Sequence, residues 1–256
     1  MKTVVIGDIH GRDIWKTIVD AHKDADRFVF LGDYVSTYDD ISDEEQINNL
    51  LKILEFAETE NMLYENRVVL LRGNHDIQHL GYHWGRCSGL NSYVQSEMVK
   101  FKDKFLAATK WIFVEDDIVY SHAGISTAWM NNVGLDDISK INDMEPTENF
   151  AFWPCKLSDY NGDSVTQPPI WIRPWTLFSY SFGKYTYVVG HTKVKSVYNL
   201  KDEMLKGYKA SYHSEDCPLS EETIRNIEAN NDVWLCDSLP GEYLVIEDRN
   251  FIPFKL

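Results

Sequence analysis

The sequence predicts an α/β fold with parallel strands at its centre. Along the first third of the chain, short runs of β-branched residues alternate with amphipathic segments of helical periodicity. Strands in that order pair in parallel through right-handed helical crossovers, so their carboxyl ends meet at one edge of the sheet. A polar, glycine-containing cluster follows each of the first three predicted strands, and we therefore expect a ligand site at that edge.

The three strands are expected at residues 3–6, 27–31 and 67–71 because each is a short apolar run. The clusters that follow them are GDIHG from position 7, GD from position 32 and RGNHD from position 72. Glycines beside these polar residues permit tight turns and close backbone approach.

Two helices are expected between these strands. Asp13 is predicted to cap the first, whose apolar side contains Ile14, Ile18 and Ala21. The second begins at residue 42, where the run SDEE has the spacing of a capping box. Its expected apolar face consists of Ile47, Leu50, Leu51 and Leu54.

The rest of the chain is predicted to continue one domain, residues 1–256. A helix is expected over 92–110, with Val94, Met98, Phe101 and Phe105 on its apolar side, and then a hairpin of 111–115 with 118–121. Further strands are expected at 185–189 and 196–198, a helix near 220–229, and a closing hairpin of 233–236 with 243–247. Residues 125–181 are rich in Trp, Pro and Asn and are predicted to form an irregular insertion or lid over the site.

The net charge of the chain limits the classes of partner that it can be expected to bind. Its 256 residues include 25 Lys and Arg against 40 Asp and Glu, a net charge of −15. Such a field repels phosphate polymers and anionic membranes, so long nucleic acid and a membrane surface are not expected partners. An anionic substrate requires a local cation, and a bound metal ion would provide one.

The cysteines indicate the compartment. Four cysteines occur without any C-x-x-C pair, which excludes the usual spacing of a zinc knuckle or a redox pair. A chain of this size needs no disulfides for stability, so we expect reduced thiols and a cytoplasmic protein. The first apolar run is too short for a signal peptide or a membrane span.

Side chains at the predicted strand ends favour a binuclear metal site. They share metal-binding or acid–base chemistry and are Asp8, His10, Asp33, Asn74, His75, His122 and His191. Two ions need oxygen and imidazole donors and one carboxylate able to bridge. We expect one ion to be held by Asp8, His10 and Asp33. The donors expected for the other are Asp33, Asn74, His122 and His191.

Each of these residues alone has an ordinary structural explanation. A single Asp after a strand is commonly a turn former or helix cap, and a single His is commonly a hydrogen-bonded core or surface residue. Five clusters that occur in order, each after a predicted strand, weigh against that explanation.

The motifs GDIHG, GDYV, RGNHD, SHAG and VGHT, in this order, resemble those of the calcineurin-like metallophosphoesterases. The resemblance is to the branch related to Ser/Thr phosphoprotein phosphatases and their bacterial and phage relatives, and the final WLCDSLPGEYLVIED is similar to the last hairpin of that family. It implies a four-layer α/β/β/α sandwich of two mixed sheets. It also implies two divalent metal ions, with manganese favoured and iron or zinc as alternatives.

The resemblance also implies roles for individual residues. Asp8, His10, Asp33, Asn74, His122 and His191 match the metal ligands, with Asp33 as the bridging Asp. His75 matches the catalytic His. The implied mechanism is attack on phosphorus by a metal-bridging hydroxide, with His75 protonating the leaving oxygen.

Three arginines are candidate substrate-binding residues. Arg173 lies in WIRPW, which is similar to a W-x-R stretch that supplies a phosphate-binding Arg in bacterial members. Packing against the neighbouring tryptophans is the alternative for Arg173. Arg72 precedes Asn74 as in the family, with a structural ion pair as its alternative. Arg12 follows the first motif, and the alternative for Arg12 is a surface residue at the start of a helix.

One motif departs from the family. The phosphoprotein phosphatases carry GDxVDRG, but here Ser36 and Thr37 stand in place of the acid and the phosphate-binding Arg. The acid normally orients the catalytic His. Asp76, Asp39 and Asp40 are the candidates to replace it.

Two further patterns have ordinary explanations that we favour. His75, His79 and His83 have four-residue spacing that would align them on a helix, but Gly81 interrupts the run and a lid or surface segment is expected rather than a zinc site. Four tryptophans could stack on a nucleobase, but buried packing is the commoner role; they are Trp129, Trp153, Trp171 and Trp175.

The sequence thus predicts a metal-dependent phosphoric ester hydrolase acting on phosphate monoesters, with a phosphoprotein or nucleotide as substrate. The alternative is a dinucleoside polyphosphate hydrolase or a phosphodiesterase. A non-catalytic binding scaffold is a third hypothesis, and it would be expected to have lost some of the ligands that are all present here.

Overall fold

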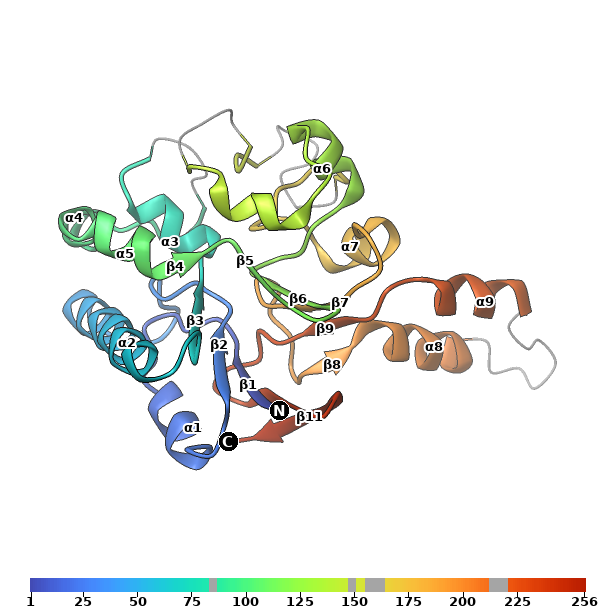
Figure 1. The fold of residues 1–256 in the computed structure, drawn as a ribbon, viewed down its shortest axis with the longest axis horizontal. Helices are drawn as coiled ribbons and strands as arrows, with labels where there is room; N and C mark the ends of the chain where they lie inside the picture. The colour runs from blue at the N-terminus through green and yellow to red at the C-terminus, as the bar shows by residue number, and fades with distance from the viewer. Residues whose placement is uncertain (83–86, 147–150, 155–163, 212–220) are drawn as a thin grey trace.

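Two mixed β-sheets form the centre of the computed structural model, which describes residues 1–82, 87–146, 151–154, 164–211 and 221–256 (Figure 1). The larger sheet contains β1 (Lys2–Ile6), β2 (Arg27–Phe30), β3 (Val68–Leu71), β4 (Thr109–Lys110), β10 (Glu242–Glu247) and β11 (Asn250–Lys255). Its order is β11-β10-β1-β2-β3-β4, and β1 to β4 are parallel. The expected parallel strands are therefore confirmed.

The smaller sheet contains β5 (Ile112–Glu115), β6 (Ile118–Ser121), β7 (Thr186–Val189), β8 (Tyr198–Asn199) and β9 (Val233–Leu235). Its order is β5-β6-β7-β9-β8. β5 and β6 form the predicted antiparallel hairpin, while β6, β7 and β9 are parallel.

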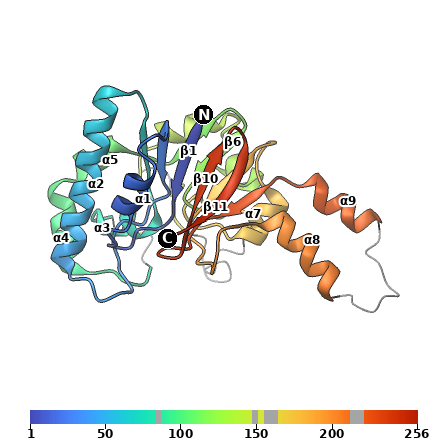
Figure 2. The ribbon, with the colours of Figure 1, turned by 90° about the horizontal axis from the view of Figure 1, so that it is seen from below.

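Helices cover the outer faces of both sheets and complete the four-layer α/β/β/α sandwich (Figure 2). On the side of the larger sheet are α1 (Trp15–Ala21), α2 (Asp43–Leu63), α3 (Asn74–His79), α4 (Ser92–Lys100) and α5 (Lys102–Ala108). The chain beyond β6 forms α6 (Thr127–Val133), the 3-10 helix η1 (Ile138–Asp143), α7 (Pro174–Tyr180), α8 (Leu200–Ser211) and α9 (Glu221–Ala229). α8 and α9 project from the body of the protein (Figures 1 and 2).

The central strands β1, β2 and β3 of the larger sheet are buried on both faces, which explains their nearly continuous apolar sequences. On β1, Val5 belongs to the cluster between the two sheets, whereas Val4 and Ile6 belong to the cluster beneath the helices. The same alternation separates Val29 from Phe28 on β2. Burying each such side chain contributes roughly 1.5–3 kcal/mol, so the two clusters together hold the strand ends in place.

The first two helices differ in their caps. The predicted capping box at Ser42 and Glu45 is present and begins α2. The predicted cap at Asp13 is wrong, because Ile14 occupies the cap position of α1 and makes no side-chain hydrogen bond. The Asp13 carboxylate is instead 3.1 Å from the Lys16 ammonium group.

Two residues expected on apolar faces are exposed. Ala21 at the end of α1 faces solvent, and Leu51 on α2 is 38% exposed. Ile53 is buried on α2 instead, because the helix turns its 3.6-residue stripe toward β3.

The single helix predicted over 92–110 is wrong. The chain forms α4 and α5, which are separated at Phe101, and then joins the larger sheet as β4. Phe101 has φ −120° and ψ 23°, which is outside the helical range, so the bend lets both helices contact α2.

The insertion and the closing hairpin also differ from prediction. Residues 125–181 are not wholly irregular, since they include α6, η1 and α7, although 147–150 and 155–163 lie outside the described residues. The predicted hairpin of 233–236 with 243–247 is wrong because β9 and β10 belong to different sheets. β10 pairs with β1 and β11, and helix α8 was not anticipated.

Two observations bear on the expected location. Cys87 and Cys236 are free thiols, whereas residues 155 and 217 lie outside the described part of the chain. Among the helices that the structure describes, none has the length and apolar character needed to span a bilayer.

Candidate metal centre

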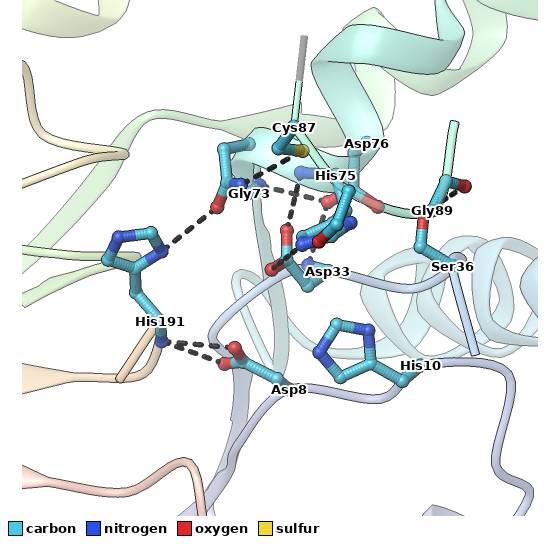
Figure 3. A network of polar contacts seen from close by, with 12 residues as sticks. Asp8, His10, Asp33, Ser36, Gly73, His75, Asp76, Cys87, Gly89 and His191 are labelled. Atoms are coloured by element: carbon cyan, nitrogen blue, oxygen red, sulfur yellow. Dashed lines mark hydrogen bonds and ion pairs between the residues drawn. The ribbon is translucent and has the colours of Figure 1, made fainter. Parts of the chain in front are cut away.

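The strand ends of both sheets meet at one edge and bring the predicted ligands together, of which Figure 3 labels Asp8, His10, Asp33 and His191. Asp8 follows β1, Asp33 follows β2 and Asn74 follows β3. The smaller sheet adds His122 directly after β6 and His191 after β7. Chain segments more than 180 residues apart therefore contact each other here, as the backbone N–H of His191 shows by donating to the Asp8 carboxylate at 3.0 Å.

Two groups of potential metal donors share one carboxylate. The first group is Asp8, His10 and Asp33, and the second is Asp33, His122 and His191; in each, the donor atoms lie within 4.8 Å of one another. Asp33 is common to both groups, which is the arrangement that a bridging carboxylate requires.

Asn74 lies beside the second group. Its Oδ1 is 2.9 Å from Nε2 of His122 and 3.0 Å from Nδ1 of His191. Nε2 of His191 is buried and has no hydrogen-bond partner within the described structure. Carboxylate, amide oxygen and imidazole donors suit Mn²⁺, Fe²⁺ or Zn²⁺, so these residues fit the divalent ions that the sequence predicts.

Backbone carbonyls orient two of the imidazoles. Nδ1 of His10 donates to the carbonyl of Val35 at 3.1 Å, and Nδ1 of His122 donates to the carbonyl of Leu31 at 2.8 Å. In both rings Nε2 is the nitrogen left to face the cluster. Metal-ligating histidines typically use such an outer hydrogen bond to fix the ring and its tautomer.

Three of the candidate ligands adopt an uncommon backbone conformation. His10, Asp33 and His191 have φ of +46°, +51° and +60°, the left-handed region that non-glycine residues rarely occupy. Such conformations persist only where the surrounding structure holds them, and they cluster at functional sites.

The charges in the cluster are strongly coupled. Burial disfavours the charged form of Asp33, but the imidazoles of His122 and His75 outweigh burial and hold its pKa well below the usual range. Burial also disfavours protonated His122, yet the carboxylates of Asp33 and Asp8 raise its pKa to about 10. Burial, with the nearby Asp237, raises the pKa of Asp8 well above normal. Crowded carboxylates of this kind favour a bound cation.

A cavity of about 440 Å³ opens onto the cluster. Its lining includes the candidate metal ligands His10, Asp33, Asn74 and His191, together with His75. Three cations also line it: Arg12, Arg173 and Lys193. Asp8 and His122 are buried and are not among the lining residues. The cavity thus gives an anionic ligand access to the metal donors despite the net charge of the chain.

The three candidate arginines have different surroundings. Arg173 lines the cavity and donates to the hydroxyl of Thr192 at 3.2 Å, and Arg12 lines it while paired with Asp39 at 2.6 Å. Arg72 is buried, donates to the backbone carbonyls of Leu106 and Thr109, and does not line the cavity. These surroundings favour the structural alternative for Arg72 over a substrate contact.

The acids expected to replace the missing Asp are engaged elsewhere. The Asp76 carboxylate accepts from the backbone N–H groups of Asp33, Tyr34 and Gly73 at 2.7–2.8 Å. Burial, reinforced by Asp33, raises its pKa to about 8. Asp39 pairs with Arg12, and Asp40 lines a separate surface hollow beside α2. Asp76 thus braces the loops that carry Asp33 and Asn74.

Several residues that line the cavity or lie behind its wall were not identified from the sequence. Tyr38 and Lys193 line the cavity, and so does Asp237, whose pKa burial raises. Gln78 contacts the His75 ring. The DSLPG stretch holds Asp237, and its similarity to the last motif was the only available signal. The others depend on loop packing and have no motif.

The remaining predicted patterns are a run of histidines and a set of four tryptophans. His79 is buried, which contradicts a surface segment; its Nδ1 donates to the carbonyl of His75 and its Nε2 accepts from the N–H of Asn91. Residue 83 lies outside the described part. Trp129 and Trp171 are buried as expected, whereas Trp153 and Trp175 are 37% and 62% exposed.

A two-sheet sandwich with an acidic, histidine-rich donor cluster at the strand ends defines a metallohydrolase of the phosphoesterase kind. Residues 1–237 match the calcineurin-like phosphoesterase family, so the chain belongs to that family and is a metal-dependent phosphoesterase. The expectations for family, fold and enzyme class are thereby confirmed.

Solved structures of two phosphatases share this fold. The chain is similar to a cold-active protein-tyrosine phosphatase of a psychrophilic Shewanella sp., with a TM-score of 0.61, 19% identity, and coverage of 99% of this chain and 77% of that one. It is also similar to a protein serine/threonine phosphatase from Saccharomyces cerevisiae, with a TM-score of 0.51, 12% identity, and coverage of 100% and 79%. No curated protein matches the chain.

Proposed function

We propose that the protein is a phosphomonoesterase that uses two divalent metal ions to release phosphate from a phosphoprotein or a nucleotide. The observation that carries this proposal is the carboxylate of Asp33, which belongs to both donor groups. We assign one ion to Asp8, His10 and Asp33. The donors assigned to the other are Asp33, Asn74, His122 and His191. Manganese is the favoured metal, with iron or zinc as alternatives.

Such ions, when bound, act as Lewis acids toward phosphoryl oxygens. Around them, Arg173 and Arg12 supply guanidinium donors for the oxygens of the same phosphate. His75 lines the cavity from the side of α3, with Nε2 4.0 Å from the Asp33 carboxylate. We propose that His75 contacts the leaving oxygen.

Hydrolysis of a P–O–P bond in a dinucleoside polyphosphate is a second candidate function. Lys193 lines the cavity together with Arg12 and Arg173, so three cations are available, more than one phosphate requires. A second phosphate of the substrate would use the additional charge.

Release of phosphate from p-nitrophenyl phosphate and from bis-p-nitrophenyl phosphate, with Mn²⁺ and without metal, tests this function. Metal-dependent cleavage of the monoester, lost in Asp33→Asn, is the expected result. Preference for the bis ester would redirect the assignment to phosphodiesters. A folded protein that cleaves neither ester with Mn²⁺, Fe²⁺ or Zn²⁺ would overturn the proposal and favour the binding scaffold.

A further inference from the structure

Two backbone groups set the orientation of the side-chain amide of Gln78. Its Oε1 accepts from the N–H of Cys87 at 3.0 Å, and its Nε2 donates to the carbonyl of Ser88 at 3.2 Å. A backbone N–H only donates and a carbonyl only accepts, so rotating the amide by half a turn would lose both bonds. Gln78 is buried, and this orientation is therefore the only one that satisfies it.

The same Nε2 lies 3.4 Å from Nδ1 of His75. An amide nitrogen has hydrogens to donate and no lone pair to accept with, so Nδ1 of His75 is the acceptor in this hydrogen bond. A neutral imidazole that accepts at Nδ1 carries its proton on Nε2. In His75 this nitrogen lies 3.4 Å from the hydroxyl of Tyr38, another residue of the cavity wall, so the N–H points into the cavity.

Gln78, and not Ser36, is the residue that contacts Nδ1 of His75. Its hydroxyl donates to the carbonyl of Gly89 at 3.3 Å and lies 3.5 Å from Nε2 of Gln78. Figure 3 shows Ser36 and Gly89 beside His75. An acid at position 36 could have accepted a proton from Nδ1. Within the described residues, no carboxylate is bonded to that nitrogen.

We propose that Gln78 is a positioning residue that holds the His75 ring with Nδ1 as a hydrogen-bond acceptor and the proton on Nε2, facing the cavity. An imidazolium would point its Nδ1–H at the N–H of Gln78, and two donors facing each other in a buried site are unfavourable. Neutral histidines held in this way act by donating a hydrogen bond to developing negative charge.

This inference rests on the proposed function and specifies what His75 does there. As a water-derived oxygen forms its bond to phosphorus, the P–O bond to the leaving group breaks. The electron pair of the broken bond stays on the leaving oxygen, which the Nε2–H of His75 stabilises by a hydrogen bond. The proton that neutralises this oxygen comes from solvent water. Full transfer from His75 would leave an imidazolate, which is a stronger base than the oxygen it protonates.

The tautomer can be measured without any turnover. In ¹⁵N-labelled protein supplied with diamagnetic Zn²⁺, two-bond correlations between ring nitrogens and carbon-bound ring protons distinguish the two neutral tautomers and the imidazolium. The His75 signals are those that disappear in His75→Asn. We expect the pattern of a neutral ring protonated at Nε2. A ring protonated at Nδ1, or at both nitrogens at neutral pH, would overturn the proposal.

Gln78→Glu places an acceptor at Nδ1 and should turn His75 into a proton donor. Proton donation benefits poor leaving groups most, so the ratio of the rates on phenyl phosphate and 2,4-dinitrophenyl phosphate should rise about 10-fold or more. Gln95→Glu is the matched control: it makes the same change on α4, where the side chain bonds the carbonyl of Gln78 at 3.2 Å and does not line the cavity.

The two readouts separate the two proposals. An unchanged ratio in Gln78→Glu, together with a ring that has become doubly protonated, would overturn the positioning role. If the wild type hydrolyses neither ester, the proposed function fails, and the tautomer measurement alone then decides whether Gln78 orients His75.

Discussion

The amide oxygen of Asn74 lies 2.9 Å from Nε2 of His122, although the two residues follow strands of different sheets. This contact joins the larger sheet to the smaller one at the donor cluster. Because Asn74 is 3% exposed, its side chain has no solvent position to adopt instead. The pair is therefore a sensitive point for the proposed metal site.

Asn74→Ala should weaken metal binding by at least about 10-fold and lower phosphatase activity with it, since one oxygen donor is removed. Equilibrium dialysis followed by metal analysis would give the affinity. Asn132→Ala, an exposed change on α6, is the control and should bind metal normally. Unaltered affinity in Asn74→Ala would remove Asn74 from the ligand set.

Arg173→Ala should raise KM for a phosphate monoester by about 10- to 100-fold, because a charge-assisted hydrogen bond to phosphate contributes roughly 1.5–3 kcal/mol. Arg173→Lys keeps the positive charge but loses the two-pronged guanidinium group, so its KM should lie between the values of the wild type and Arg173→Ala. Steady-state kinetics measures the effect. A fall in kcat at constant KM would instead place Arg173 in a transition-state contact.

Arg72→Met should lower the free energy of unfolding by about 2–4 kcal/mol, because it leaves the backbone carbonyls of Leu106 and Thr109 without their buried donor. Burial already lowers the pKa of Arg72 to about 10. Urea unfolding gives the stability. KM for phosphate esters should stay at the wild-type value, and a large rise in KM with normal stability would restore Arg72 as a substrate contact.

Gly190→Ala should lower activity about 10-fold or more while the protein remains folded, because the added methyl group overlaps the carboxylate of Asp8 and moves it. Activity and circular dichroism would be compared in the same preparation. Gly134→Ala, where an added Cβ meets nothing within 4 Å, is the control for a small backbone cost. Full activity in Gly190→Ala would show that Asp8 tolerates displacement.

His22 should make the fold less stable in mild acid. Burial, with the nearby Lys2, lowers the pKa of His22, whose Nε2 lies 2.8 Å from the Tyr243 hydroxyl. As pH falls below the usual histidine pKa of about 6.5, the unfolded chain takes up a proton that the folded chain resists. Stability present above that pH is thus lost as pH falls toward the lowered pKa.

His22→Gln removes this contribution. Between about pH 7.5 and about pH 5.5, the wild type should lose more unfolding free energy than His22→Gln, measured by urea titration at each pH. Parallel pH dependence of the two proteins would show that His22 titrates alike in both states.

Much of the site could be predicted from the sequence because its residues lie in short motifs directly after the strands. Asp8, Asp33 and Asn74 each follow a short apolar strand, and parallel pairing necessarily brings such positions to one edge. The capping box at Ser42 was equally local, since both partners lie within four residues. The motifs therefore predicted the strand ends and the donor set without knowledge of the packing.

Packing decided the elements whose partners lie far away in sequence. A continuous helical pattern over 92–110 breaks at Phe101 because the chain must turn to add β4 beside β3. The sequences of β9 and β10 both predict strands, but the two strands belong to different sheets, because β9 pairs with β7 and β10 pairs with β1. Periodicity records which face is buried and not which element buries it.

The surroundings of His75 show the same division. Its identity and its place after β3 follow from the sequence alone, as do the glycines and carboxylates around it. Which group faces Nδ1 depends on the loop that carries Cys87 and Ser88, because only their backbone groups orient the amide of Gln78. Sequence determined the reactive groups, and tertiary structure decided their hydrogen-bond partners, since those bonds are made through space by residues with no local pattern.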